Sequence, residues 1–105
     1  MKTITYKVFS VYPDRDIKDE VKGKLFYWND IALAIRHEGF KYSGQYYWIV
    51  DEISSGKRVK KERGTRKFVI EYVNRFLDSL GITKVKEVIA ENEKINNIEE
   101  VLNHV

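Results

Sequence analysis

Basic side chains are concentrated in one short stretch of this 105-residue chain. Residues 57–67 contain seven basic groups and one acid, Glu62, which gives a local net charge of +6. The whole chain has 19 basic and 16 acidic residues, so the remaining residues carry 12 basic and 15 acidic groups, a net of −3. A basic patch on a slightly acidic body is the electrostatic footprint expected for an anionic partner.

The elements that must position these groups are a β-hairpin and a helix. Residues 45–53 are rich in aromatic and β-branched side chains, residues 54–56 (Ser-Ser-Gly) form a turn, and residues 57–64 form a basic second arm. Residues 65–80 follow as an amphipathic helix, capped by Thr65 and ended by Gly81. Its predicted inward stripe is Val69, Val73, Phe76, Leu77 and Leu80, flanked by Phe68 and Tyr72. A basic arm therefore leads directly into a helix N-terminus.

That helix N-terminus carries the wrong charge for an isolated helix. Arg66 and Lys67 stand in the first turn, where the helix dipole disfavours cations by a few tenths to about 1 kcal/mol. An anion held by the backbone N–H groups of residues 64–67 would reverse the sign of that effect. The sequence thus predicts a non-catalytic protein that grips the phosphate backbone of a nucleic acid. The predicted contacts are Lys57, Arg58, Lys60, Lys61, Arg63, Thr65, Arg66 and Lys67.

Other interpretations of the same stretch stay open. Val59 is the only apolar residue of the second arm, so this arm is expected at a sheet edge, where lysine discourages aggregation between strands. The chain also fits a protein-interaction module of the kind that phages and mobile elements encode, docking on an acidic partner surface. Basic groups lining one face with a helix N-terminus would favour nucleic acid, whereas a contiguous exposed apolar patch would favour a protein partner.

Aromatic residues near the hairpin allow two roles. Tyr42, Tyr46 and Trp48 could stack on the bases of a single strand. A small α+β domain also needs such side chains to close its sheet, and this core role is the favoured one.

Residues suited to catalysis or metal binding do not form a recognisable motif. His37 has no nucleophile or second histidine beside it, and the acids Asp14, Asp16, Asp19 and Glu20 lack the glycine and glutamate of a calcium loop. Residues 20–22 (Glu-Val-Lys) have the spacing of a metal nuclease, but we expect them in a loop. Asp51 and Glu52 should point to opposite faces of a strand. No enzyme activity, metal or cofactor is predicted.

The rest of the chain predicts a single α+β domain over residues 1–105. A small, mainly antiparallel sheet of three to four strands comes from residues 2–12, 45–53 and 57–63, with residues 24–28 as a further candidate; residues 13–24 are a charged loop. A helix is expected over residues 30–38, capped by Asn29 or Asp30 and ended by Gly39, before a turn at 40–44. Residues 84–90 are either helix or strand, and Asn97 caps a last helix, giving two to four helices in all.

The amino-acid composition indicates the cellular compartment that the chain is suited to. The chain has no cysteine, which excludes a disulfide scaffold and fits a reducing interior such as the cytoplasm. No apolar run approaches the ~20 residues that span a membrane.

Residues 45–80 resemble the AP2-like arm-binding domain of phage integrases. The likeness rests on the strand with Trp48, the Gly56-Lys57-Arg58 turn, the basic second strand and the helix that follows. In that family the sheet lies in a DNA groove with the helix packed beneath it. The resemblance implies DNA rather than RNA, with Arg58, Lys60, Arg63 and Lys67 at the positions that meet DNA.

Overall fold

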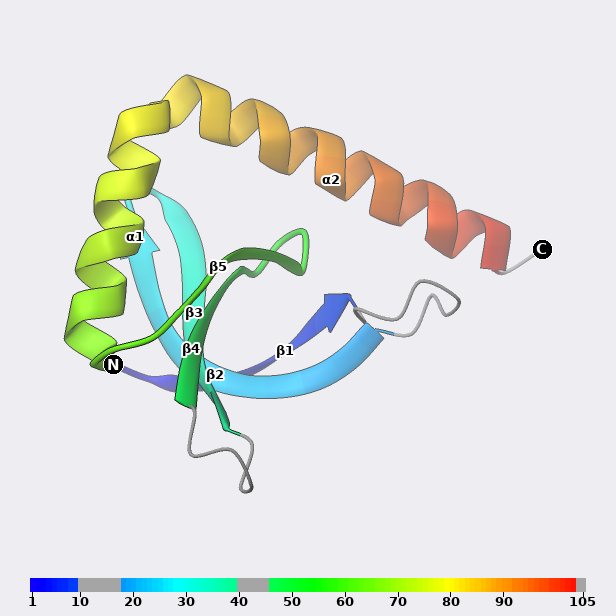
Figure 1. Cartoon of the computed structure of the whole chain (residues 1–105). Coiled ribbons are helices and arrows are strands. Elements are labelled where there is room, and N and C mark those ends of the chain that lie inside the picture. Colours follow the sequence, from blue (N-terminus) through cyan, green and yellow to red (C-terminus); the bar gives the residue numbers. More distant parts are fainter. Residues whose placement is uncertain (10–17, 40–45, 104–105) are drawn as a thin grey trace.

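A curled antiparallel sheet and two helices make up the computed structural model, which describes residues 1–9, 18–39 and 46–103. Side chains are described for residues 1–8, 19–38 and 47–93. The elements are β1 (Thr3–Phe9), β2 (Lys18–Trp28), β3 (Ile31–Gly39), β4 (Tyr46–Glu52), β5 (Lys57–Glu62), α1 (Arg66–Leu80) and α2 (Ile82–Asn103). The α+β class is confirmed, with five strands and two helices in the described residues (Figure 1).

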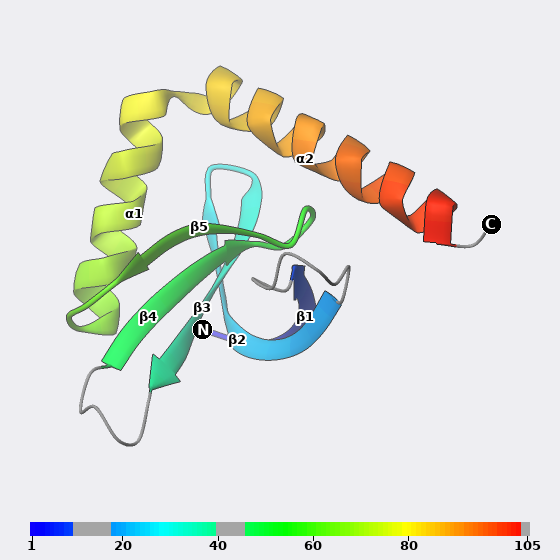
Figure 2. The ribbon, with the colours of Figure 1, turned by 45° about the vertical axis from the view of Figure 1, so that its right-hand side comes forward.

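The strands form an up-and-down meander in the order β1-β2-β3-β4-β5, and every neighbouring pair is antiparallel. The sheet curls so strongly that β1 returns toward the other end of the meander (Figure 2). The hydroxyl of Tyr6 on β1 reaches Asp51 on β4. Gly56 lies against β1, because a Cβ atom there would stand 2.8 Å from the carbonyl oxygen of Lys7. The sheet thus has a concave inner face and a convex outer face.

Helix α1 covers the outer face of the sheet. Its buried residues Val69, Val73 and Leu77 repeat every fourth position and pack on side chains of β2, β3 and β4. The partners in that core include Trp28, Leu33, Ile35 and Val50. The predicted helix over residues 65–80 is confirmed, but the predicted inward stripe is too wide, since Phe76 and Leu80 stay exposed together with Phe68 and Tyr72.

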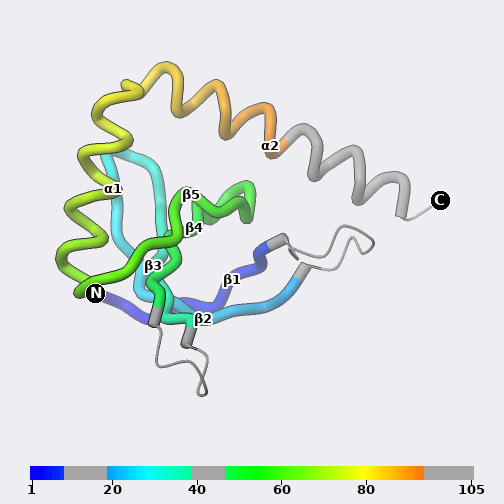
Figure 3. The backbone as a smooth tube through the Cα atoms, in the orientation of Figure 1, coloured from blue at the N-terminus to red at the C-terminus, as the bar shows by residue number. Residues whose placement is uncertain are grey.

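Helix α2 follows α1 after Gly81 and crosses above the β4–β5 turn (Figure 3). Val85 and Ile89 anchor its first half to the outer-face core. The question left open for residues 84–90 is settled as helix. The expected separate helix beginning at Asn97 is wrong, because the backbone of α2 runs continuously from Ile82 to Asn103.

Two segments differ from the sequence prediction. Residues 18–24, expected in a charged loop, form the first half of β2. The helix expected over residues 30–38 is wrong, because residues 31–38 lie in β3. Asn29 and Asp30 make a two-residue hairpin turn, in which Asn29 has φ 53, instead of capping a helix. Gly39 ends a strand and not a helix. Residues 31–35 show no alternation of polar and apolar groups because α1 covers one face of β3 and the curled sheet covers the other.

The hairpin itself agrees with the prediction, with arms at 46–52 and 57–62. The first strand is confirmed over residues 3–9. Residues 10–17 and 40–45, including the expected turn at 40–44, lie outside the described residues. Among the residues that the structure describes, no helix is long and apolar enough to cross a membrane.

Candidate nucleic-acid interface

Strand β5 is the last strand of the meander, and within the described residues it pairs only with β4. Its register sets Lys60 opposite Val50 and Lys61 opposite Ile49. Neighbouring residues of a strand point to opposite faces, so Lys60 faces the helix side of the sheet and Lys61 the concave side. The predicted basic arm is therefore divided between two faces of an edge strand.

On the helix side, Lys60 lies against α1. Its Nζ atom is 5.3 Å from the centre of the Tyr72 ring and 5.7 Å from that of Phe76. Cations over aromatic faces are stabilised by the ring quadrupole. Lys60 is thus held at the outer edge of the sheet with its charged group over the two rings.

On the concave side, Lys61 and Arg63 gather around Tyr47. The Lys61 Nζ atom lies 4.8 Å from the Tyr47 ring centre and 3.3 Å from Glu38 Oε2. The Arg63 guanidinium lies 4.8 Å from the same ring centre and donates a hydrogen bond to the Tyr47 hydroxyl. Glu38 neutralises part of this cluster, so these two cations present less charge to a ligand than the sequence suggested.

The start of α1 is fixed by contacts with β4. Trp48 packs against the outer-face core, and its Nε1 donates to the carbonyl oxygen of Gly64 at 2.8 Å. The Thr65 hydroxyl accepts a hydrogen bond from Phe68 N at 3.1 Å, which confirms the predicted cap. Gly64 has φ 126, and a Cβ atom there would lie 2.9 Å from the Phe68 ring. Glycine is therefore required at the junction between the basic arm and the helix.

Three exposed cations complete the surface. Arg58 on β5 and Arg66 and Lys67 in the first turn of α1 are all exposed. Residues 66–69 contain no acid, so the N-terminal partial charge of the helix is not balanced by a neighbouring carboxylate in its own turn. We call residues 57–67 the basic edge.

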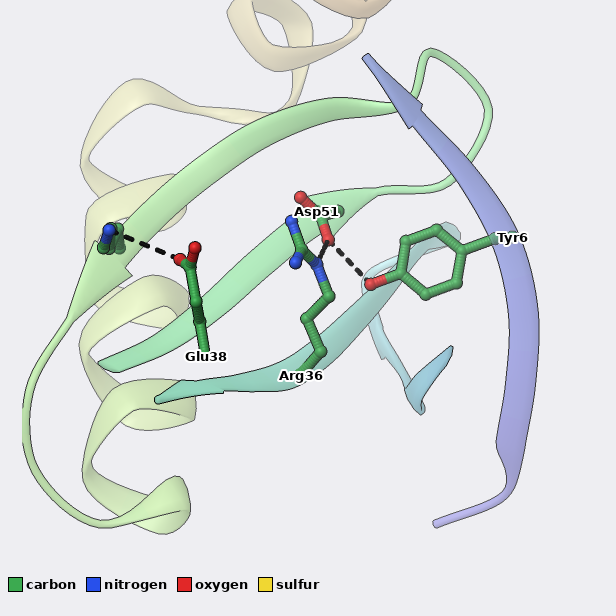
Figure 4. A network of polar contacts seen from close by, with 5 residues as sticks. Tyr6, Arg36, Glu38 and Asp51 are labelled. Carbon is green, nitrogen blue, oxygen red and sulfur yellow. Dashed lines mark hydrogen bonds and ion pairs between the residues drawn. The ribbon is translucent and has the colours of Figure 1, made fainter. Parts of the chain in front are cut away.

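A second charged cluster lies on the concave face, where its members pair with one another (Figure 4). Asp51 Oδ2 accepts hydrogen bonds from Tyr6 Oη at 2.7 Å and from Arg36 Nε at 2.8 Å. Burial, then the hydrogen bond to Asp51 and its charge, raise the pKa of Tyr6 above its ordinary range. Burial alone would lower the pKa of Arg36, but the hydrogen bond and charge of Asp51 outweigh burial and raise it.

Sequence reasoning missed this network because its members are far apart in the chain. Tyr6 and Asp51 are separated by 45 residues. The adjacent carboxylate, Glu52, does not share it: Glu52 accepts hydrogen bonds from the backbone N–H groups of Ser54 and Ser55 at 2.7 and 2.9 Å. The expectation that Asp51 and Glu52 act separately agrees with these partners.

The remaining candidates for catalysis or metal binding form no metal-binding group among the side chains that the structure describes. His37, expected in a helix, is an exposed residue of β3 whose ring centre lies 4.7 Å from that of Trp48. Glu20 and Lys22, expected in a loop, are on β2, whereas Asp14, Asp16 and Tyr42 lie outside the described residues. Where side chains are described, no three His, Asp or Glu groups are placed to hold a metal ion.

Trp48 has a structural role, as its core contacts and its indole hydrogen bond show. The side chain of Tyr46 is not among those that the structure describes. Trp48 is therefore part of the fold and not of an exposed stacking platform. Among the described side chains, the exposed phenylalanine and tyrosine rings are those of Tyr27 on β2 and of Phe68, Tyr72 and Phe76 on α1.

Comparison with known proteins gives no match, whether to a protein-family model, a curated protein or a solved structure.

Proposed function

We propose that this protein binds the phosphate backbone of a nucleic acid through the basic edge, without catalysing a reaction. The observation that carries the proposal is a group of exposed cations in one short stretch of chain: Arg58 on β5, Arg63 after it, and Arg66 and Lys67 at the start of α1. Cations on an edge strand are open to an extended polyanion, and backbone N–H groups at a helix start add donors for a phosphate.

The contacts are unequal in this proposal. Arg58, Arg66 and Lys67 supply most of the attraction because they are exposed, while Lys60 is drawn toward the rings of α1 and Lys61 toward Glu38. Arg63 is also exposed and contributes attraction from its position beside Tyr47. The hydrogen bond from Trp48 to Gly64 keeps the strand and the helix start in one rigid arrangement. DNA is the preferred ligand, on the resemblance of residues 45–80 to an arm-binding domain.

The test is a salt titration of binding to short double-stranded and single-stranded oligonucleotides. A protein that neutralises four or five phosphates gives a log–log slope of about −3 to −5 with salt concentration, since each contact releases counterions. The first variant replaces four exposed cations of the basic edge by serine: Arg58, Arg63, Arg66 and Lys67. We expect it to lose at least about tenfold in affinity, with a shallower salt slope.

A matched control removes the same charge elsewhere. Lys2, Lys22, Arg75 and Lys84 are also exposed and lie outside residues 57–67, so their change to serine lowers the net charge equally. This control variant should keep most of the affinity. Equal losses in both variants, or no binding of the native chain at about 50 mM salt, would refute the proposal.

A further inference from the structure

Helix α1, the first half of α2 and strand β5 enclose an apolar groove of about 220 Å³ on the outer face of the molecule. Its walls are Leu77, Leu80, Val85, Val88, Ile89 and Val59. Leu80 and Val88 remain 45% and 42% exposed, so the groove opens to solvent where the two helices diverge. Large exposed aliphatic side chains of this kind have no use in binding phosphates.

An exposed apolar stripe leads out of the groove along α1. Phe68, Tyr72, Phe76 and Leu80 follow one another at four-residue spacing, and each is more than a third exposed. From Phe68 to Leu80 the helix rises about 18 Å, which is the length of roughly three turns of a second helix lying alongside. Rows of exposed apolar side chains beside an apolar groove are a feature of docking sites in proteins.

Positive charge borders this apolar surface. Lys57 and Arg58 line the groove from β5, and Lys60 lies over the rings of Tyr72 and Phe76. The acid at the groove, Glu52, already accepts hydrogen bonds from the Ser54 and Ser55 N–H groups and from the Ser54 hydroxyl. The rim therefore complements a ligand that is apolar on one side and acidic on its flanks.

We propose that the groove and the α1 stripe bind an acidic amphipathic helix of a partner protein. Apolar side chains of that helix, spaced three and four residues apart, would enter the groove and lie along the stripe, as in other helix-in-groove complexes. Its carboxylates would meet Lys57, Arg58 and Lys60. This proposal does not rest on nucleic-acid binding, because the aliphatic residues that carry it lie outside the basic edge, Val59 excepted.

The test uses the full-length chain and three labelled synthetic peptides of about 14 residues, or four helical turns. The first has leucine at helical three- and four-residue spacing and glutamate between, the second replaces glutamate by lysine, and the third replaces leucine by serine. Fluorescence anisotropy should detect binding of the first peptide alone. Equal binding of the serine peptide would mean a purely electrostatic contact and would overturn the proposal.

Variants locate the binding site. Leu80→Ser and Val88→Ser each change a side chain that is already nearly half exposed, and each should weaken peptide binding at least about tenfold. Tyr27→Ser is the matched control, because Tyr27 is 61% exposed and lies on β2, away from the groove. Unchanged affinity in both groove variants would refute the assignment.

The same variants separate the two proposals. Leu80→Ser and Val88→Ser should leave oligonucleotide binding unchanged, whereas Arg66→Ser with Lys67→Ser should weaken oligonucleotide binding and should weaken peptide binding much less than Leu80→Ser does. Sedimentation of the native chain measures its oligomeric state, and we expect a monomer. A dimer that becomes monomeric in Leu80→Ser would show that a second copy of the chain covers the groove, and would overturn the proposal that a partner helix binds there.

Discussion

The concave face of the sheet and the basic edge contain the same kinds of charged residue in different surroundings. On the concave face, Asp51 is 1% exposed and accepts hydrogen bonds from Arg36 and Tyr6. Along the edge, Arg58, Arg66 and Lys67 are exposed. Buried charges stabilise the fold only as satisfied pairs, whereas exposed cations cost little and stay available to a ligand. Burial therefore separates the charges that hold the curl from those proposed to bind a partner.

Lys61 and Glu38 lie at the boundary between these two regions. Both side chains are about one-third exposed, and their ion pair spans 3.3 Å on the concave side of β3 and β5. Lys61 belongs to the basic edge by its position in the sequence, but its contacts with Tyr47 and Glu38 lie on the concave face. Substitutions in each region, and at this boundary, should therefore differ in whether they change stability or binding.

The largest effect is expected on the concave face. Asp51→Asn leaves the Arg36 guanidinium without its carboxylate in a part-buried site, and should lower the free energy of unfolding by about 3 kcal/mol. Urea denaturation measures the loss. Asp30→Asn is the control, because Asp30 pairs with Lys86 at 3.0 Å on the exposed surface and should show no measurable loss. Similar losses in both variants would contradict the prediction that the buried ion pair contributes more stability than the exposed one.

The next effect is expected at Gly64, where the edge strand meets α1. Gly64→Ala puts a Cβ atom 2.9 Å from the Phe68 ring at φ 126, and should cost about 2 kcal/mol while weakening oligonucleotide binding. Gly81→Ala at the other end of α1 has φ 84 but nothing within 4 Å of the added Cβ. Thermal unfolding should show a smaller loss for Gly81→Ala, and its oligonucleotide affinity should equal that of the native chain.

A smaller, pH-dependent effect is expected at Tyr6. Tyr6→Phe removes a hydrogen bond to Asp51 and should cost about 1 kcal/mol near pH 8. Because the pKa of Tyr6 is raised in the folded state, the unfolded chain loses this proton first, near the ordinary value of 10.0. The native chain should therefore lose stability above pH 10 more steeply than Tyr6→Phe. Denaturation from pH 8 to 11 tests this, with exposed Tyr27→Phe as control; parallel curves would contradict the raised pKa.

The smallest effect is expected at the boundary. Glu38→Gln removes the carboxylate beside Lys61 and should change stability by only a few tenths of a kcal/mol, since both groups are partly solvated. It should tighten oligonucleotide binding about twofold by restoring positive charge to the edge. Glu71→Gln, an exposed change on α1, is the control for net charge. Equal tightening in both variants would place Lys61 outside the binding surface.

Elements with local signals were predictable from the sequence. The hairpin at 46–62 follows from its aromatic and β-branched arm and its Ser-Ser-Gly turn, and α1 from its apolar spacing with Thr65 and Gly81 at its ends. The basic edge was also visible, because it is a cluster within one short stretch. Its exposure was not, since Lys60 and Lys61 point to opposite faces and meet different partners.

The sequence by itself determined a basic hairpin that runs into a capped helix, because turn chemistry, capping and charge are local properties. Only the tertiary structure decided that residues 31–39 are a strand: with both faces covered, all five positions of 31–35 are apolar and the period of two disappears. The curl likewise decided that Asp51 meets Tyr6 and Arg36. The angle between α1 and α2 leaves an apolar groove open beside the basic edge. The sequence could not show this, because the burial of an apolar residue depends on the elements that pack against it.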